Sequence, residues 1–478
     1  MKKNTIIIIV MISVGCTFSA QFDSLVLSII NSSGHRSQNI GFEVRRVRDN
    51  QKIAELNSDS AMIPASLQKL FTAAAAFDKL GTIFKSETKI YAENFDKVSG
   101  EIKGNMYIVG AGDPGISAQR LWLMTQHLRH CGVKSIPNKL VIDNSYFDEN
   151  AVAPGFDEEQ NSRAYMSPIS AFAVSFNSTG IVVQPTAEGR NAYVHLFPAR
   201  EDVSFRGGVA TATKGKDLSV STQKSAANEI SVILGGAIKP DEKPKYVYRQ
   251  SWEPVSNAGE SFRVVAKESG INAKFSVDIG KVDTTKAQLI LVHESEPIYF
   301  AVGGMFKYSN NFIAEMIFLT LAAQTSNSPA NWETASQIVE KWWEEKFPQG
   351  GKICVVNGSG MGNQNKCGVG QIADLLNYAS KQNWFYEYVS GMPIAGIDGT
   401  LSTRFKNSDL KGNLRAKTGT LNNFGVSSLA GYFNANGELY SAVFIANDRA
   451  TAQYAKWTLS DNLISGIKKA IEAKKEQK

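Results

Sequence analysis

Long helical patterns are confined to the two ends of the chain, and short β-rich runs fill its middle. Apolar residues recur at helical spacing within residues 22–88 and again within residues 298–478. Between these zones, runs such as Met106–Val109 and Lys139–Ile142 are short and bounded by Gly, Pro, Asn and Asp. A chain of 478 residues is also too long for one compact domain. We therefore expect a multidomain protein of the α/β (α+β) class.

The C-terminal zone carries its own strand signal. Residues 413–420, 426–433 and 439–446 are predicted as three strands joined by tight turns, one of them at Asn436-Gly437. A final helical pattern follows over residues 457–473. This order predicts an antiparallel sheet covered by helices. The other helical patterns in the two zones are Leu67–Leu80, Asn311–Ala323, Trp332–Trp343 and Ile372–Ser380.

The first twenty residues are typical of a secretory signal. Two lysines precede an apolar run over residues 6–14, and small residues follow as far as Ala20. We expect residues 1–20 to be a signal peptide, with export to the periplasm and no transmembrane anchor in the mature form. The segment ending in Cys16 also resembles a lipoprotein cleavage box, so lipidation at Cys16 is the alternative.

Loss of the signal leaves three cysteines, Cys131, Cys354 and Cys367. Cys354 and Cys367 flank a glycine-rich turn at residues 357–362, and an oxidising compartment would allow them to form a disulfide across it. Two free buried thiols are the other interpretation.

Composition argues against two classes of function. Lys plus Arg number 51 and Asp plus Glu 45, and the resulting charge of +6 is spread without long basic runs, so nucleic-acid binding is not expected. The five histidines include no zinc-protease spacing. His127 and His130 are three residues apart on a predicted helix, next to Cys131, and an exposed or packed helix face is favoured there over a metal site. We therefore expect no metal site.

One serine is placed for nucleophilic chemistry. Ser66-Leu-Gln-Lys69 opens an apolar helical segment, and residues at i and i+3 share a helix face, so the lysine amine can approach the serine hydroxyl. The apolar residues that follow bury the lysine stem and lower the cost of keeping its amine neutral. Four other serines have a lysine at the same spacing, but none of them opens an apolar helix: Ser86, Ser221, Ser408 and Ser465.

The order of two later motifs strengthens the case for Ser66. Ser309-Asn310-Asn311 precedes another apolar helical segment, and Lys417-Thr418-Gly419 ends a predicted strand. Ser-x-x-Lys, Ser-x-Asn and Lys-Thr-Gly in this order are typical of penicillin-binding proteins and β-lactamases.

Longer stretches resemble one family within that group. The chain resembles the D-alanyl-D-alanine carboxypeptidase/endopeptidase type of low-molecular-weight class C penicillin-binding protein, the S13 peptidase family. The similar segments are Gly104–Pro114, Lys307–Met316, Pro393–Leu401, Arg415–Leu421 and Ser428–Tyr432.

The resemblance implies a catalytic domain that is split along the chain. Ser66 and Ser309 are much further apart than in a compact β-lactamase, so extra domains are inserted between them. A transpeptidase/β-lactamase-like domain, with an antiparallel sheet flanked by helices, would then carry β-rich insertions. The implied boundaries are 21–88 and 298–478 for the catalytic domain, 89–180 and 250–297 for the inserted domain, and 181–249 for a nested β-rich domain.

The resemblance also implies residue roles. Ser66 would attack the carbonyl of the penultimate D-alanine, with Lys69 as base. Ser309 would relay a proton to the leaving amine, Asn311 would bind the peptide amide, and Lys417 would supply positive charge.

Substrate binding is implied for a further set of residues. The hydroxyls of Thr418 and Thr420, with Gly419 between them, would hold the terminal carboxylate, and the backbone N–H groups of Ser66 and Thr420 would form the oxyanion hole. An acidic segment resembles the family segment that binds the diamino-acid side chain. Its residues are Asp157, Glu158 and Glu159.

The implied function is a serine carboxypeptidase that acts on peptidoglycan stem peptides and is acylated by β-lactams, without a metal or organic cofactor. The balance of carboxypeptidase and endopeptidase activity and the oligomeric state, including a homo-oligomer, are left open. A β-lactamase or esterase of the same superfamily and a non-catalytic cell-wall-binding protein are the alternatives.

Overall fold

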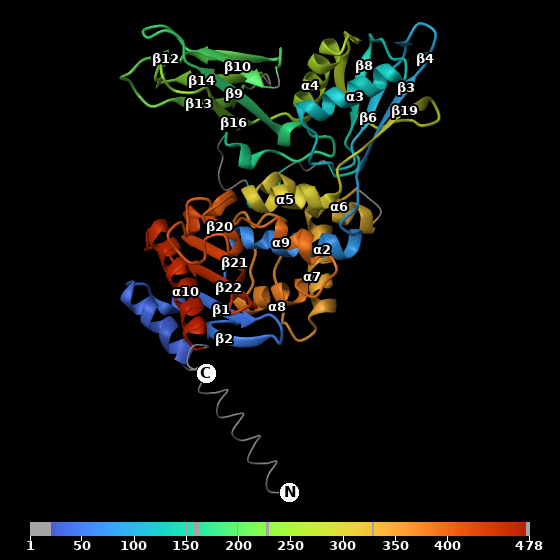
Figure 1. Ribbon diagram of the computed structural model, residues 1–478. Helices are drawn as coiled ribbons and strands as arrows, with labels where there is room; N and C mark the ends of the chain where they lie inside the picture. Colours follow the sequence, from blue (N-terminus) through green and yellow to red (C-terminus); the bar gives the residue numbers. More distant parts are fainter. Residues whose placement is uncertain are drawn as a thin grey trace, which may run out of the picture. The chain divides into compact units, whose positions relative to one another are not determined.

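The computed structural model describes most of the chain as two compact units, which Figure 1 shows in sequence colours. The described residues are 21–148, 152–156, 162–197, 199–225, 229–326 and 329–474. Within these ranges, the first unit comprises residues 21–82, 302–310 and 335–474, and the second comprises residues 83–301 and 311–334.

A five-stranded antiparallel sheet forms the centre of the first unit. The predicted C-terminal meander is confirmed, and its turn at Asn436-Gly437 has positive φ at both residues, 53° and 81°, as a type I′ hairpin requires. In spatial order the strands are β2 (Gln51–Leu56), β1 (Ile40–Arg46), β22 (Glu438–Asn447), β21 (Val426–Ala435) and β20 (Arg415–Leu421).

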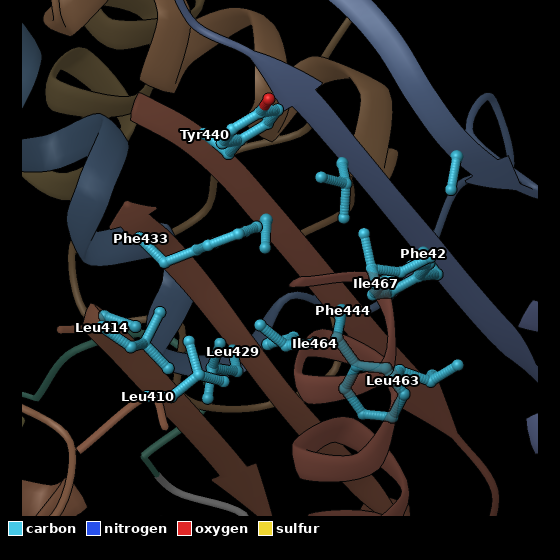
Figure 2. Packing of buried hydrophobic residues seen from close by; sticks show 14 of the residues in the cluster. Phe42, Leu410, Leu414, Leu429, Phe433, Tyr440, Phe444, Leu463, Ile464 and Ile467 are labelled. Atoms are coloured by element: carbon cyan, nitrogen blue, oxygen red, sulfur yellow. The ribbon is translucent and has the colours of Figure 1, made fainter. Parts of the chain in front are cut away.

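Helices cover this sheet. Leu463 from α10 (Gln453–Ala473) packs in a hydrophobic core with Phe42 and Phe444 of the sheet (Figure 2). Phe22, from the helix over residues 21–32, belongs to the same core. The helix α8 (Val369–Ala379) contacts β1 and β22. The remaining helices of this unit include α2 (Gln68–Leu80), α9 (Phe385–Ser390), most of α5 (Ile298–Tyr308) and most of α7 (Trp332–Lys346). The predicted sheet with helical cover is therefore confirmed.

The structure adds two strands that the sequence analysis does not anticipate. β1 and β2 lie within the N-terminal zone, where only helical patterns are predicted. The burial pattern of β1 explains this, because its first six residues are all buried and show no alternation of apolar and exposed positions. β1 pairs with β22 from Ile40↔Ala446 to Arg46↔Tyr440, so the two ends of the chain build one sheet.

The second unit contains a mixed five-stranded sheet with helices α3 (Ala118–His130) and α4 (Pro254–Glu268) packed on one apolar core. α6 (Asn311–Ser326) belongs to this unit as well. The strands are β18 (Ser276–Ile279), β8 (Lys139–Asp143), β6 (Met106–Val109), β3 (Glu87–Glu93) and β19 (Ala287–Glu294). A smaller sheet contains β17 (Asn272–Ala273), β7 (Ser135–Ile136), β5 (Glu101–Ile102) and β4 (Phe95–Asp96).

The rest of the second unit is β-rich. Two three-stranded sheets enclose a shared apolar core that includes Ile181, Leu196 and Val232. The first sheet consists of β10 (Tyr193–Phe197), β9 (Ser178–Gln184) and β16 (Lys245–Gln250). The second consists of β11 (Val203–Gly207), β14 (Ile230–Gly235) and β13 (Ser219–Lys224), and β12 (Ala210–Thr211) pairs with β15 (Ala237–Ile238).

The cysteines do not pair in the part of the chain that the structure describes. Cys131 and Cys354 are exposed free thiols, and Cys367 is a buried one, where burial raises its pKa to about 12. Cys354 pairs through its backbone with Lys366, the neighbour of Cys367. Successive side chains of an extended segment point to opposite faces, so the two sulfurs do not face one another. Of the two interpretations, the disulfide is therefore wrong, and of the two free thiols only Cys367 is buried.

Candidate active site

Ser66 lies where a 3-10 turn, Ala65–Leu67, leads into α2. Ala65 has a positive φ of 50°, which turns the chain sharply before the helix begins. Ser66 is half-buried, whereas the first ten residues of α2, from Gln68 to Phe77, are all buried. The apolar helix therefore fixes the backbone of Ser66 while its side chain stays accessible.

The amine of Lys69 contacts the Ser66 hydroxyl, as the helical spacing predicts. Lys69 Nζ lies 2.9 Å from Ser66 Oγ and donates a second hydrogen bond to the Ser359 carbonyl at 2.7 Å. The Lys69 side chain is fully buried. The second contact holds the amine in place beside the hydroxyl, so the pair is arranged for proton transfer from serine to lysine.

The loop that supplies this carbonyl is a functional element that sequence reasoning missed. From the sequence, residues 357–362 are predicted only as a turn. Besides the contact from Lys69, the Gly358 carbonyl accepts a hydrogen bond from Thr72 Oγ1 at 2.8 Å. Gly360 has φ +80°, and a Cβ there would lie 1.9 Å from the Ala65 carbonyl oxygen. The run of glycines is the one signal in the sequence for this close approach.

Ser309 and Lys417 form a second serine–lysine pair. Ser309 directly follows α5 with a positive φ of 54°, and Lys417 Nζ lies 2.7 Å from Ser309 Oγ. Lys417 is fully buried in β20 and also donates to the Thr418 carbonyl. Two residues before Ser309, Lys307 Nζ donates to Asp398 Oδ2 at 2.6 Å and to the Met392 carbonyl at 2.7 Å, which ties the end of α5 to the loop around residue 398.

Lys417 is fully buried and lies near a second buried lysine, Lys69. Burial, together with the nearby charge of Lys69, holds the pKa of Lys417 well below its ordinary value. Burial is the larger cause, because an ammonium group loses its hydration there. The folded protein therefore holds Lys417 in an environment that disfavours its charge.

The lowered pKa of Lys417 predicts how the free energy of unfolding depends on pH. Below the pKa of an unfolded lysine, about 10.4, the unfolded chain binds the Lys417 proton more readily than the folded chain, which costs stability. Above that pH the amine is neutral in both states and the cost disappears. Lys417→Met is therefore expected to raise the free energy of unfolding more at pH 7 than at about pH 11, measured by urea unfolding. The exposed Lys411→Met is the control, and an equal gain at both pH values would contradict the prediction.

Gly419 brings β20 next to the nucleophile. A Cβ at Gly419 would lie 2.9 Å from the Ser66 backbone nitrogen and 3.1 Å from Ala65 Cβ. In the next strand, Ser428 pairs with Gly419 and donates a hydrogen bond from Oγ to the Pro64 carbonyl at 2.8 Å. The absence of a side chain at Gly419 thus allows β20 to pack against the turn that carries Ser66.

Thr418 of the Lys-Thr-Gly motif and Thr420, which follows it, lie on the other face of β20. Thr418 is half-buried and Thr420 is exposed, whereas Lys417 and Gly419 are buried, in the alternation typical of a strand. Thr418 Oγ1 lies 2.7 Å from Thr400 Oγ1. Thr400 lies within the segment Pro393–Leu401, which resembles the family, but no role is predicted for it from the sequence.

The remaining candidates are placed differently. Asn311 begins α6, in the second unit, and its side-chain amide donates to the Tyr165 carbonyl at 3.4 Å. The first unit thus brings together Ser66, Lys69, Ser309, Lys417 and Gly419, while Asn311 belongs to the other unit. The three acidic candidates, Asp157, Glu158 and Glu159, lie outside the described residues. No group of three metal-ligating side chains occurs among the residues that the structure describes.

A helix-opening serine with a lysine one turn later, a Ser-x-Asn and a Lys-Thr-Gly strand beside an antiparallel sheet are the features of the serine enzymes that include penicillin-binding proteins and β-lactamases. Comparison with known proteins narrows this class. The model of the D-Ala-D-Ala carboxypeptidase 3 (S13) family matches residues 26–463. The chain belongs to this family, which confirms the resemblance seen in the sequence.

Individual relatives support the same family assignment. A D-alanyl-D-alanine carboxypeptidase from an Actinomadura species is 30% identical over 384 residues, which cover 78% of this chain and 70% of the relative. The carboxypeptidase DacB of Haemophilus influenzae is 26% identical over 437 residues, 90% of each chain. The crystal structure of penicillin binding protein 4 (dacB) from Haemophilus influenzae aligns with a TM-score of 0.75 and 25% identity, covering 90% of this chain and 96% of that one. A second crystal structure of that protein contains a β-lactam.

Proposed function

We propose that the protein is a serine D-Ala-D-Ala carboxypeptidase that acts on peptidoglycan stem peptides through an acyl-enzyme on Ser66. The observation that carries the proposal is the 2.9 Å contact between Ser66 Oγ and the buried Nζ of Lys69, in a chain of the S13 family. Lys69, in its unprotonated form, accepts the hydroxyl proton while Ser66 Oγ attacks the carbonyl of the penultimate D-alanine.

Donors near Ser66 stabilise the charge that develops on the substrate oxygen. The backbone N–H groups of Ser66 and Thr420 are the proposed oxyanion hole, and the close approach of Gly419 to the Ser66 nitrogen supports it. When the tetrahedral intermediate collapses, the C–N bond breaks and the terminal D-alanine leaves with a proton. Water then cleaves the ester and restores the Ser66 hydroxyl.

Ser309 and Lys417 act on the leaving group and on the carboxylate of the substrate. Ser309 Oγ, which contacts Lys417 Nζ, relays the proton to the departing amine, and Lys417 provides a cation near the substrate carboxylate when it is protonated. Thr418 and Thr420 donate hydroxyl hydrogen bonds to that carboxylate, and Asn311 binds the peptide amide. These groups complete the chemistry without a metal or organic cofactor.

Penicillin tests the assignment of the nucleophile. A β-lactam presents a strained amide where the scissile peptide bond would lie, so attack is expected to leave a slowly hydrolysed ester on Ser66. Mass spectrometry of a penicillin-treated digest should place the adduct on the peptide that contains Ser66. An adduct on any other peptide would refute the proposal.

The acidic segment at residues 157–159 is proposed to bind the amine of the diamino-acid side chain. Asp157→Asn, Glu158→Gln and Glu159→Gln together should weaken turnover of diaminopimelate-bearing peptides by about tenfold, the value of one lost charged hydrogen bond, while penicillin acylation stays nearly unchanged. The kcat/KM values and acylation rates of the variant and the parent provide the measurement. Equal loss of both activities would contradict a role in side-chain recognition.

The choice of substrate separates the remaining functions. A carboxypeptidase releases D-alanine from monomeric muropeptides, whereas an endopeptidase cleaves crosslinked dimers. Hydrolysis of penicillin with rapid turnover would indicate a β-lactamase instead, and a non-catalytic wall-binding protein would cleave none of these substrates. Purified monomers, dimers and penicillin offered to the same preparation therefore distinguish all four.

We further propose that the protein is exported to the periplasm after cleavage of residues 1–20, which lie outside the described part of the structure, with lipidation at Cys16 as the alternative. Among the described helices, none has the length and apolar character needed to cross a bilayer. The proposed partners are peptidoglycan stem peptides and β-lactams.

A further inference from the structure

The sheet of β10, β9 and β16 has two faces of different character. Residues Ile181, Leu196 and Val247 point into the apolar core shared with the neighbouring sheet. Because successive residues of a strand alternate between faces, the intervening residues point outward. In register across β10, β9 and β16, the outward rows are Phe197–Gly180–Tyr248, His195–Val182–Tyr246 and Tyr193–Gln184.

Four aromatic rings on this outward face are more than half exposed. The exposed fractions are 60% for Tyr193, 56% for Phe197, 61% for Tyr246 and 51% for Tyr248. The His195 ring packs against Tyr193, with ring centroids 5.2 Å apart. Single exposed aromatic residues are ordinary, but several on one face indicate a binding surface. We call these five side chains, on β10 and β16, the aromatic face.

Gly180 in the middle strand, β9, has no side chain, so the centre of the aromatic face lies below the rings on either side. Gly180 stands between Phe197 and Tyr248, and a Cβ there would lie 3.3 Å from Tyr248 Cε1 and 2.6 Å from the Phe197 carbonyl oxygen. Tyr248 therefore leans over Gly180 and still exposes half of its surface. Covering the glycine explains the position of that one ring but leaves Tyr193, Phe197 and Tyr246 unexplained.

The outward positions carry no carboxylate, ammonium or guanidinium group. Besides the aromatic face they contain Ser178, Gly180, Val182, Gln184 and Gln250. Charged residues make up 20% of the chain, so ten uncharged positions on one face are a distinct feature. A polyanion such as nucleic acid needs cations to neutralise it. The absence of charge instead matches a neutral ligand.

The geometry points to the neutral backbone of a glycan strand as the ligand of the aromatic face. The face of an aromatic ring is electron-rich and attracts the C–H groups of a sugar ring, while tyrosine hydroxyls and the Gln184 amide can hydrogen-bond sugar hydroxyls. β10 and β16 are two strand spacings apart, about 10 Å, and Tyr193 and Phe197 are separated by about 13 Å along the strand. The area therefore accommodates more than one sugar ring.

The choice of a glycan rests on the proposed function, because stem peptides are attached to a polysaccharide. An enzyme that binds both parts of this polymer gains avidity without any change in its chemistry. The aromatic face would hold the glycan, and the Ser66 site would process the peptides.

Soluble oligomers of N-acetylglucosamine, which carry no charged group, are the probe. We expect the mature full-length protein with Tyr193→Ser and Tyr246→Ser to bind them at least tenfold more weakly than the parent, measured by calorimetry. Removal of the other two rings in a Phe197→Ser and Tyr248→Ser variant should give a similar loss. Tyr454→Ser removes a tyrosine that is 76% exposed at the start of α10, in the first unit, and is the matched control.

Activity on a soluble pentapeptide separates this inference from the proposed function. All four proteins should keep the parent's kcat and KM on that peptide, because the aromatic face does not take part in the chemistry. Glycan binding that is absent from the parent, or equal in the parent and both face variants, would overturn the inference. A change of oligomeric state in the face variants with unchanged glycan binding would also overturn it and would identify a second copy of the chain as the occupant.

Discussion

Ser66→Ala is expected to abolish both penicillin labelling and D-alanine release, with a loss on the order of 10⁴-fold or more. The variant removes the atom that would form the ester. Lys69→Ala should be nearly as damaging, because Ser66 Oγ then loses the amine that lies 2.9 Å away. In the double variant the two losses should not add, since the residues act as one unit.

The controls for this prediction come from the chain itself. Ser221 and Lys224 repeat the Ser-x-x-Lys spacing, but both lie in the strand β13, where residues at i and i+3 point to opposite faces. Ser221→Ala should therefore leave acylation unchanged. Thermal unfolding of Ser66→Ala should match that of the parent, because a lost hydroxyl leaves only a small void. Labelling that survives in Ser66→Ala would exclude Ser66 as the nucleophile.

Gly360→Ala is expected to slow penicillin acylation by about 100-fold, the typical cost of displacing a catalytic group by about 1 Å. A Cβ at this position would lie 1.9 Å from the Ala65 carbonyl oxygen, which is backbone and cannot rotate away. The chain must shift, and the shift would reach Ser66 and the Ser359 carbonyl that holds Lys69. Together with the strain of its positive φ, the change should lower the free energy of unfolding by about 2–4 kcal/mol.

Gly437→Ala provides the matched control for backbone strain. Gly437 has φ +81°, almost the same as Gly360 at +80°, but no atom lies within 4 Å of the Cβ that alanine would add. This variant should lose about 1 kcal/mol of stability and keep its acylation rate. Stopped-flow acylation and urea unfolding are measured for both variants. The difference between them gives the effect of the steric clash at Gly360, because both variants carry the strain of a positive φ. If both variants acylated at the parent rate, the loop at residues 357–362 would have no part in positioning the nucleophile.

Predictability from the sequence differs between parts of the site. Ser66 and Lys69 are predictable because a helix fixes the geometry of residues three apart, whatever surrounds it. The order of the Ser309 and Lys417 motifs indicates the group of penicillin-binding proteins and β-lactamases, and the 2.7 Å contact between these two residues then follows from the fold. The Ser359 carbonyl has no such signal, because every residue has a main-chain carbonyl and only the packing of the loop selects this one.

The sequence by itself determined the elements whose signal is local. Helical spacing determined α2 and α6, and Asn436-Gly437 determined the turn of the C-terminal hairpin, since φ > 0 at both positions is a property of those residue types. The three motifs determined the chemistry on the same basis, as residue types at fixed spacing.

Tertiary structure alone decided the features that join distant segments. β1 is buried on both faces and has no alternating pattern, so only its pairing with β22 shows that it completes the catalytic sheet. Gly360 and Gly419 are ordinary glycines in the sequence and matter because other backbone segments approach them within van der Waals distance. Such contacts depend on how the whole chain positions two distant segments, which residue type and local spacing do not determine.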